Sequence, residues 1–293
     1  MTKRKAAEYL YQGKFDQAIV RTQYAAEFTG KPKYNAGSVE QLIALLGMIE
    51  TDSSITDLRW MAYMLATVYL ESSRTVKTQV TTKDKKGNVV TKDIKVWQNF
   101  VPVEEMGYGA KDYGKPVKVT QRDDGKAVIT EWDGDQWLVN TSGSYDKLLK
   151  TANPTQGFRA KGQVAPTAPV DIYVNEPGDE HLYYGRGYVQ LTWWSNYAAA
   201  GKMLNRGLDF LLNPDLVNDP KVAYAVLSTG MRTGGAFANR KTFAKYFHDD
   251  VTDYVGARAM VNANGDAKEV AEYAHLFEKI LFAARLQTLA PKP

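Results

Sequence analysis

Hydrophobic positions repeat at helical spacing over several long segments of the chain. Apolar side chains recur every three or four residues over residues 38–49, 54–70, 223–231 and 266–281, which predicts amphipathic helices with one face toward a core. Two shorter helices are predicted before them, over residues 6–10 and 15–28. The pattern therefore predicts a mainly α protein in which most of these helices serve packing.

Two other segments carry β patterns. Residues 77–98 alternate Val and Thr on both sides of Lys-Lys-Gly-Asn, which predicts a hairpin. Residues 117–132 predict a second hairpin around Asp-Asp-Gly, followed by a short strand near Trp137, and residues 153–169 have the composition of a loop. Trp132 and Trp137 are candidates for stacking on sugar rings, although aromatic side chains of small β units more often pack in a core.

The segment YYGRGYVQLTWWSNY, residues 183–197, is the most informative part of the chain. Alternation over residues 189–194 predicts a half-buried strand that presents an amide, a hydroxyl and aromatic rings at one edge. Gly185 and Gly187 flank Arg186 and allow a tight turn there. Ser195 and Asn196 are expected to cap a helix that begins near residue 197. Such an edge suits a sugar, but a buried strand with incidental polar residues fits the pattern equally well.

The helix over residues 54–70 leads to a second candidate. Ser54 is a possible N-cap, with Asp57 three residues later. Glu71 follows at the C-terminal end of the helix, where the helix dipole disfavours a negative charge. A general acid needs surroundings that keep its proton. An exposed glutamate at a fraying helix end is the alternative interpretation.

Composition narrows the classes of function. The chain of 293 residues has no cysteine, which excludes disulfides and thiol catalysis, and its three histidines lack an HExxH spacing, so no metal site is expected. A net charge of +4 suits approach to an anionic polymer, whereas nucleic-acid binding normally needs denser Lys and Arg clusters. No apolar run is long enough to insert into a membrane, and the basic N-terminus lacks the apolar stretch of a secretory signal. We therefore expect synthesis in the cytoplasm and action after release, injection or incorporation into a virion.

Several segments together resemble glycoside hydrolase family 19, which contains chitinases and related phage and bacterial peptidoglycan hydrolases. YYGRGYVQLTW followed by NY resembles the central signature of the family, and FVPVEEMGYGAKDYG, residues 100–114, resembles its second acidic segment. NPDL followed by DP at residues 213–220 resembles a further family motif. DLRWMAYMLATVYLESSRT resembles the helix that delivers the catalytic acid, which typically ends in His-Glu-Thr; here the triplet is Leu70-Glu71-Ser72.

The resemblance implies a fold and a domain organisation. It implies a mainly α (α+β), lysozyme-like two-lobed helical domain with a central cleft and small β-hairpin insertions. Residues 1–293 would form a single catalytic domain, with a hairpin insertion at residues 77–98 and a β-rich or loop insertion at residues 117–180. A monomer that requires no cofactor is expected.

The resemblance also implies a mechanism with two carboxyl groups. Glu71 would protonate the leaving oxygen, and Glu105, with Glu104 as second choice, would take a proton from a water molecule held by Thr192. In an inverting glycosidase the two carboxyl groups lie roughly 6.5–9.5 Å apart, which leaves room for that water. Adjacent glutamates on an extended loop cannot both face one cleft, so only one of Glu104 and Glu105 should be essential.

The remaining family positions are assigned to substrate binding, while Arg186 is expected to tie its loop to a carboxylate. The substrate-binding candidates are Tyr184, Gln190, Trp193, Asn196 and Asn262. The sequence favours peptidoglycan as the substrate, as for an endolysin. Chitin is the alternative substrate, and a non-catalytic wall-binding or structural virion protein is the alternative of a different class.

Overall fold

The computed structural model describes residues 4–83, 87–106, 116–121, 127–132, 137–139, 181–207, 209–262 and 265–286. The chain divides into two compact units. Unit 1 comprises Met1–Val101, Phe247–Val255 and Asp266–Pro293, and unit 2 comprises Pro102–Tyr246 and Gly256–Gly265. The described residues are mainly helical with small antiparallel sheets, so the predicted mainly α class is confirmed. The assignment of residues 1–293 to one catalytic domain stays a prediction.

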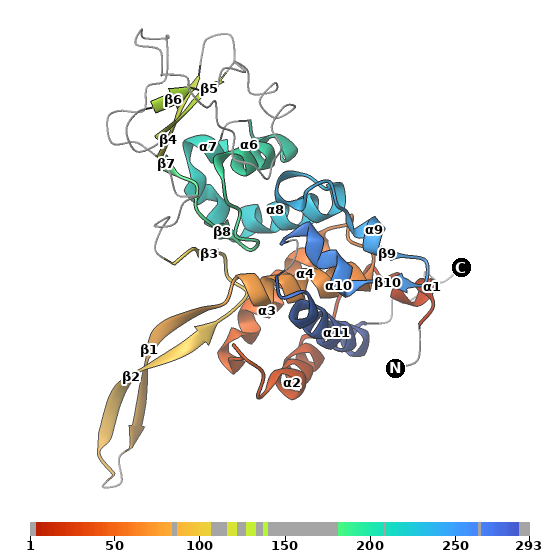
Figure 1. Cartoon of the computed structure of the whole chain (residues 1–293). Helices are drawn as coiled ribbons and strands as arrows, with labels where there is room; N and C mark the ends of the chain where they lie inside the picture. The colour runs from red at the N-terminus through yellow and green to blue at the C-terminus, as the bar shows by residue number, and fades with distance from the viewer. Residues whose placement is uncertain are drawn as a thin grey trace. The chain divides into compact units, whose positions relative to one another are not determined.

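Unit 1 is built on helices whose apolar faces meet. These are α1 (Ala6–Tyr9), α2 (Gln17–Phe28), α3 (Val39–Thr51), α4 (Leu58–Glu71) and α11 (Ala267–Ala284). In Figure 1 the dark blue α11 lies beside the orange α4 and the red α2, and these helices contact one another. The ring of Phe28 lies at the centre, with centroid distances of 4.9 Å to Tyr69 and 4.8 Å to Phe277. Burial of these aromatic side chains is the main source of stability in this core.

Helix α4 begins later than the sequence indicates, so the expectation of a cap at Ser54 is wrong. The N-cap is Asp57, whose carboxylate accepts a hydrogen bond from the Arg59 backbone N–H at 2.8 Å. Ser54 instead donates its backbone N–H to the Asp52 carboxylate at 3.0 Å. Asp57 caps the helix and also pairs with the buried Arg59, so the helix starts at Asp57 and not at Ser54.

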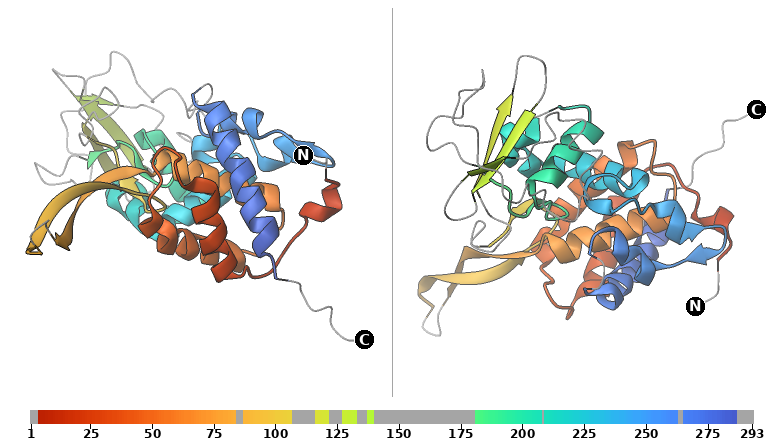
Figure 2. Two further views of the ribbon diagram at one scale, coloured as in Figure 1. Left: turned by 90° about the horizontal axis from the view of Figure 1, so that it is seen from below. Right: turned by 45° about the horizontal axis from the view of Figure 1, so that its top comes forward.

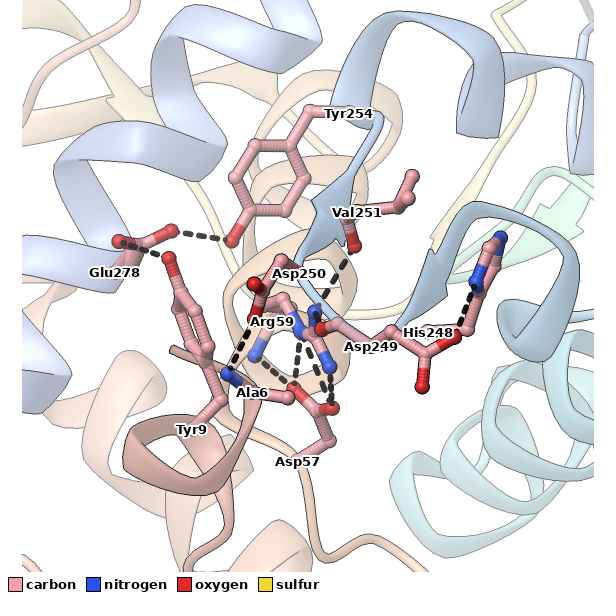
Figure 3. Close-up of polar contacts among 10 residues, drawn as sticks. All are labelled: Ala6, Tyr9, Asp57, Arg59, His248, Asp249, Asp250, Val251, Tyr254 and Glu278. Atoms are coloured by element: carbon pink, nitrogen blue, oxygen red, sulfur yellow. Dashed lines mark hydrogen bonds and ion pairs between the residues drawn. The ribbon is translucent and has the colours of Figure 1, made fainter. Parts of the chain in front are cut away.

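A buried polar network joins the separate segments of unit 1 (Figure 3). Arg59 is bidentate to Asp57 and donates to the carbonyl oxygens of Asp249 and Val251, both at 2.9 Å. Asp249 lies in the turn between β9 (Phe247–His248) and β10 (Val251–Thr252), and Val251 is the first residue of β10. Nearby, the Glu278 carboxylate of α11 accepts from Tyr254 at 2.8 Å and from Tyr9 at 3.5 Å. The network thus fastens the N-terminal segment and the β9–β10 turn to α4 and α11.

The predicted hairpin is present as β1 (Arg74–Lys83) and β2 (Val89–Gln98), paired in register from Arg74 opposite Gln98 to Lys83 opposite Val89. Both views in Figure 2 show this ribbon extending away from the helices of unit 1. The two strands pair with each other and with no third strand among the described residues. That the hairpin is an insertion relative to the family stays a prediction.

Unit 2 combines short strands and helices. Its sheets are β3 (Val103–Glu104) with β8 (Arg186–Gly187), and β4 (Pro116–Gln121), β5 (Ala127–Trp132), β6 (Trp137–Val139) and β7 (His181–Leu182) in the order β6-β5-β4-β7. Its helices are α6 (Trp194–Met203), α7 (Asp209–Leu212), α8 (Pro220–Thr233) and α9 (Phe243–Tyr246), with 3-10 turns at Pro214–Asn218 and Ala236–Ala238. At its boundary with unit 1, α10 (Tyr254–Ala257) is followed by a 3-10 turn at Arg258–Met260.

The predicted hairpin within residues 117–132 is therefore present as β4 and β5, and the predicted strand near residue 137 is present as β6. The sugar-stacking roles of Trp132 and Trp137 stay predictions, because only the backbone of these strands is described. The loop predicted at residues 153–169 lies outside the described residues.

An aspartate followed by a proline, as at Asp219-Pro220, is a sequence pattern that starts helices, and helix α8 begins there. The Asp219 carboxylate accepts from the backbone N–H groups of Lys221 and Val222 at 2.9 and 3.1 Å, and Pro220 occupies the first helical position. At α11 Asp266 is the N-cap residue, but its side chain makes no cap hydrogen bond. Its backbone adopts a φ of 58°, which is uncommon for a residue other than glycine.

Candidate active site

Glu71 is the last residue of α4 and belongs to unit 1. It is half-buried and follows a continuous buried stretch of the helix, residues 61–70. Three side chains hold the end of the helix: Lys33 donates to the Leu70 carbonyl at 3.3 Å, the Ser72 hydroxyl donates to the Val68 carbonyl at 2.6 Å, and the Ser73 hydroxyl donates to the Tyr69 carbonyl. The glutamate is thus placed on a rigid helix end, and its role as the acid stays a prediction.

Residues 189–194 do not form the strand that their alternation suggests. The strand β8 ends at Gly187, residues 188–190 form a turn, and the chain returns so that Leu191 bridges back to Arg186. Gln190 and Trp193 adopt φ angles of 51° and 71°, outside the extended region. A tight loop therefore replaces the predicted strand edge.

Gly187 makes this loop possible. Its φ is +80°, and a Cβ at this position would lie 3.0 Å from the Val217 carbonyl oxygen and from Val217 Cγ1. A residue with a side chain would be strained in the backbone and crowded at the same time.

The helix after the loop also begins earlier than expected. Helix α6 starts at Trp194, with Trp193 as N-cap residue and without a side-chain cap bond. Asn196 therefore lies in its first turn, where its Nδ2 donates to the Thr192 carbonyl at 2.8 Å. Asn196 Oδ1 is buried and accepts no hydrogen bond from the residues that the structure describes.

Arg186 has the structural role expected from the sequence. Its side chain is 4% exposed, and its Nε donates to the Asp215 carboxylate at 2.9 Å. The guanidinium lies over the Tyr184 ring at 3.7 Å and donates to the Tyr197 hydroxyl at 3.2 Å. Burial raises the pKa of both tyrosines. Arg186 therefore ties the loop to a carboxylate and to two rings that remain neutral.

The two adjacent glutamates have different surroundings. Glu104 lies on β3 opposite Arg186, and its Oε1 accepts from the Tyr184 hydroxyl at 3.3 Å and from Asn218 Nδ2 at 3.2 Å. Glu105 meets the backbone of Gly185 twice: its N–H donates to the Gly185 carbonyl at 2.8 Å, and its carboxylate accepts the Gly185 N–H at 3.3 Å. The two carboxylates thus have separate sets of partners.

The Gln190 side chain links the loop to β3 by a hydrogen bond to a backbone carbonyl. Its Nε2 donates to the Val103 carbonyl at 2.9 Å, which ties the loop to β3. Thr192 and Trp193 are both half-buried at the end of the loop, where the Trp193 N–H donates to the Tyr183 carbonyl at 2.8 Å. The amide of Gln190 therefore has a structural function, and its role in binding substrate stays a prediction, as do the roles of Thr192 and Trp193.

Asn262 lies elsewhere in unit 2, on the turn after the 3-10 helix Arg258–Met260. It is exposed, and its N–H donates to the Arg258 carbonyl at 2.9 Å. The buried Arg258 side chain donates to the Gly265 carbonyl at 2.7 Å and so supports the same turn.

The structure therefore brings Glu104, Glu105, Tyr184 and Gln190 together around β3 and β8. Sequence reasoning missed Asn218, which connects Glu104 to the loop. Asn218 lies within the motif at residues 213–220, but nothing in the sequence relates this asparagine to Glu104, more than a hundred residues earlier.

No described helix has the length and apolar character needed to cross a membrane. Within the part of the chain that the structure describes, no group of three His, Cys, Asp or Glu side chains is arranged to hold a metal ion.

Residues 143–236 match the family model of class I chitinases. An endochitinase of Arabidopsis thaliana is 48% identical over 81 residues, 26% of this chain and 27% of its own length. Chitinase 11 of Oryza sativa is 46% identical over 78 residues, 26% of this chain and 29% of its own.

An inactive chitinase-like protein of Hevea brasiliensis is 47% identical over 55 residues, 19% of this chain and 16% of its own. The chain thus spans only 16–29% of the length of these relatives. No solved structure matches the chain. The predicted resemblance to glycoside hydrolase family 19 is confirmed over residues 143–236, the segment that matches the family model of class I chitinases.

Proposed function

We propose that the protein is a chitinase-type glycoside hydrolase that cleaves β-1,4 bonds between N-acetylglucosamine units. The observation that carries this proposal is the class I chitinase match over residues 143–236, which contains the Arg186 loop and the residues around it. Relatives named as an endochitinase in Arabidopsis thaliana and as a chitinase in Oryza sativa support chitin as the substrate. Chitin therefore replaces peptidoglycan, which the sequence had favoured, as the preferred substrate.

The proposed mechanism is a single displacement. Glu71 protonates the leaving oxygen, and Glu105 takes a proton from the attacking water, which the Thr192 hydroxyl helps to hold. Tyr184, Asn196 and Trp193 contribute to the sugar site. Under this proposal the protein acts on wall polymer outside the cell that makes it.

The test is hydrolysis of colloidal chitin and of purified peptidoglycan by the wild type, Glu71→Gln and Glu105→Gln. We expect reducing ends from chitin, products of inverted anomeric configuration, and a loss of about 10²–10⁴-fold in each variant. Glutamine keeps the size of the side chain and removes the titrating group.

Two outcomes would overturn the proposal in different ways. Cleavage of peptidoglycan alone would reinstate the endolysin function. Binding to chitin without cleavage, with both variants equal to the wild type, would make the protein a non-catalytic wall-binding protein; one relative, from Hevea brasiliensis, is named an inactive chitinase-like protein.

A further inference from the structure

We propose that Glu104 is a positioning residue: it holds β3 in place, so that Glu105 alone acts as the base. This inference rests on the proposed function. The two glutamates are adjacent on an extended segment, where successive side chains point to opposite sides. Their partners reflect this: the Glu104 carboxylate is turned toward side chains of unit 2, whereas the Glu105 carboxylate meets a backbone N–H.

The Glu104 carboxylate is already occupied by donors. Its Oε1 accepts from Tyr184 and Asn218 and lies 3.8 Å from Arg186 Nε. Charge-assisted hydrogen bonds to a carboxylate are stronger than neutral ones. Taking a proton from water would disrupt three favourable interactions at once, which makes Glu104 unsuited to the task of a base.

Each partner of Glu104 is itself fixed. Asn218 uses its other amide atom, Oδ1, to accept the Gly187 N–H at 3.2 Å, so the same side chain bridges β3 and β8. Arg186 is held by Asp215 at 2.9 Å. Glu104 therefore links β3 to Arg186 on β8 and to Asn218 at the end of the 3-10 helix Pro214–Asn218. Both partners are held in place by other contacts.

The consequence falls on the neighbouring residue. Glu105 is held in place by its two contacts with Gly185, and Gly185 belongs to the same loop that Glu104 anchors. Displacing a catalytic group by about 1 Å can cost on the order of 10²-fold in rate. Loss of the Glu104 anchor should therefore lower kcat without removing the titrating base.

The kinetic test compares Glu104→Gln, Glu104→Ala and Glu105→Gln by the pH dependence of kcat and KM on a soluble N-acetylglucosamine oligomer. Glu104→Gln retains an acceptor for Tyr184 and Asn218, so we expect less than a roughly 10-fold loss of kcat; for Glu104→Ala we expect about 10–100-fold. Both should keep the rise of activity with pH that a base produces, and Glu105→Gln should lose it. Loss of that rise in Glu104→Gln, with its retention in Glu105→Gln, would make Glu104 the base and overturn the proposal.

A structural readout separates this proposal from the hydrolase function. We expect amide hydrogen exchange at Glu105, whose N–H donates to the Gly185 carbonyl, to accelerate in Glu104→Ala and to stay near the wild-type rate in Glu104→Gln. Asn218→Ala should also accelerate exchange, and the double variant with Glu104→Ala should show less than the sum of the two effects, because the Asn218–Glu104 hydrogen bond is lost in both single variants. Unchanged exchange in Glu104→Ala would refute the positioning role even if the enzyme is active, and a protein without hydrolytic activity would leave this measurement valid.

Discussion

At the scale of single residues, the buried ion pair between Arg59 and Asp57 has a large expected effect on stability. The two side chains are 3% and 7% exposed. Removing one partner of a buried pair leaves an uncompensated charge and costs about 3–5 kcal/mol. We expect Arg59→Met to lower the free energy of unfolding by this amount in urea titrations.

The pair between Arg21 and Glu40 is the matched control. Its side chains are 40% and 64% exposed, and exposed pairs contribute little to stability because water screens the two charges. Arg21→Met should therefore leave the unfolding curve nearly unchanged. Equal destabilisation by the two methionine variants would show that the buried network in Figure 3 is not what holds unit 1 together.

Residue-level predictions succeeded where the partner is local and failed where it is distant. Asp219 and Pro220 start a helix through donors two and three residues away, and the sequence contains that signal. Asp57 displaces Ser54 as a cap while paired to an arginine that also binds the β9–β10 turn, almost two hundred residues later. Asn218 was missed for the same reason, since its contact with Glu104 exists only in the folded chain.

At the scale of elements, periodicity identified the long helices and the hairpins but not the loop at residues 188–193. Helix α11 buries Val270, Tyr273 and Phe277 as its spacing predicts. Alternation over residues 189–194 indicated a strand, yet Gln190 adopts a positive φ and directs its amide to the carbonyl of Val103. The gain from this long-range hydrogen bond outweighs the local preference for an extended chain, and local patterns cannot contain it.

The hairpin β1–β2 gives an element-scale prediction. Lys77 and Lys95 are cross-strand partners, so residues 78–94 can be replaced by Asn-Gly, which forms a two-residue hairpin turn. Because the removed part pairs only with itself among the described strands, we expect the free energy of unfolding to change by less than about 1 kcal/mol. Urea titration followed by fluorescence measures this. A loss of several kcal/mol would show that the ribbon supports the fold.

At the scale of the whole molecule, buried tyrosines in both units determine the response to alkali. Burial raises the pKa of Tyr24 and Tyr69 in unit 1 and of Tyr183 in unit 2, and raises that of Tyr188 to about 12. In the unfolded chain a tyrosine loses its proton near pH 10, while in the folded protein these groups keep theirs. A rise of pH above about 10 therefore stabilises the unfolded state relative to the folded state. The stabilisation that comes from burying the neutral tyrosines is fully present only below that pH.

We accordingly expect the free energy of unfolding to be flat with respect to these groups below about pH 9 and to fall between pH 10 and 12. Each such tyrosine contributes at most about 1.4 kcal/mol per pH unit. Tyr188→Phe should make the fall less steep, because phenylalanine has no proton to lose in either state, and Tyr34→Phe, at a half-buried ring, serves as the control. Urea titrations at pH 8, 10 and 11 measure the slope. The same slope in wild type and Tyr188→Phe, or stability that rises with pH in this window, would contradict the linkage.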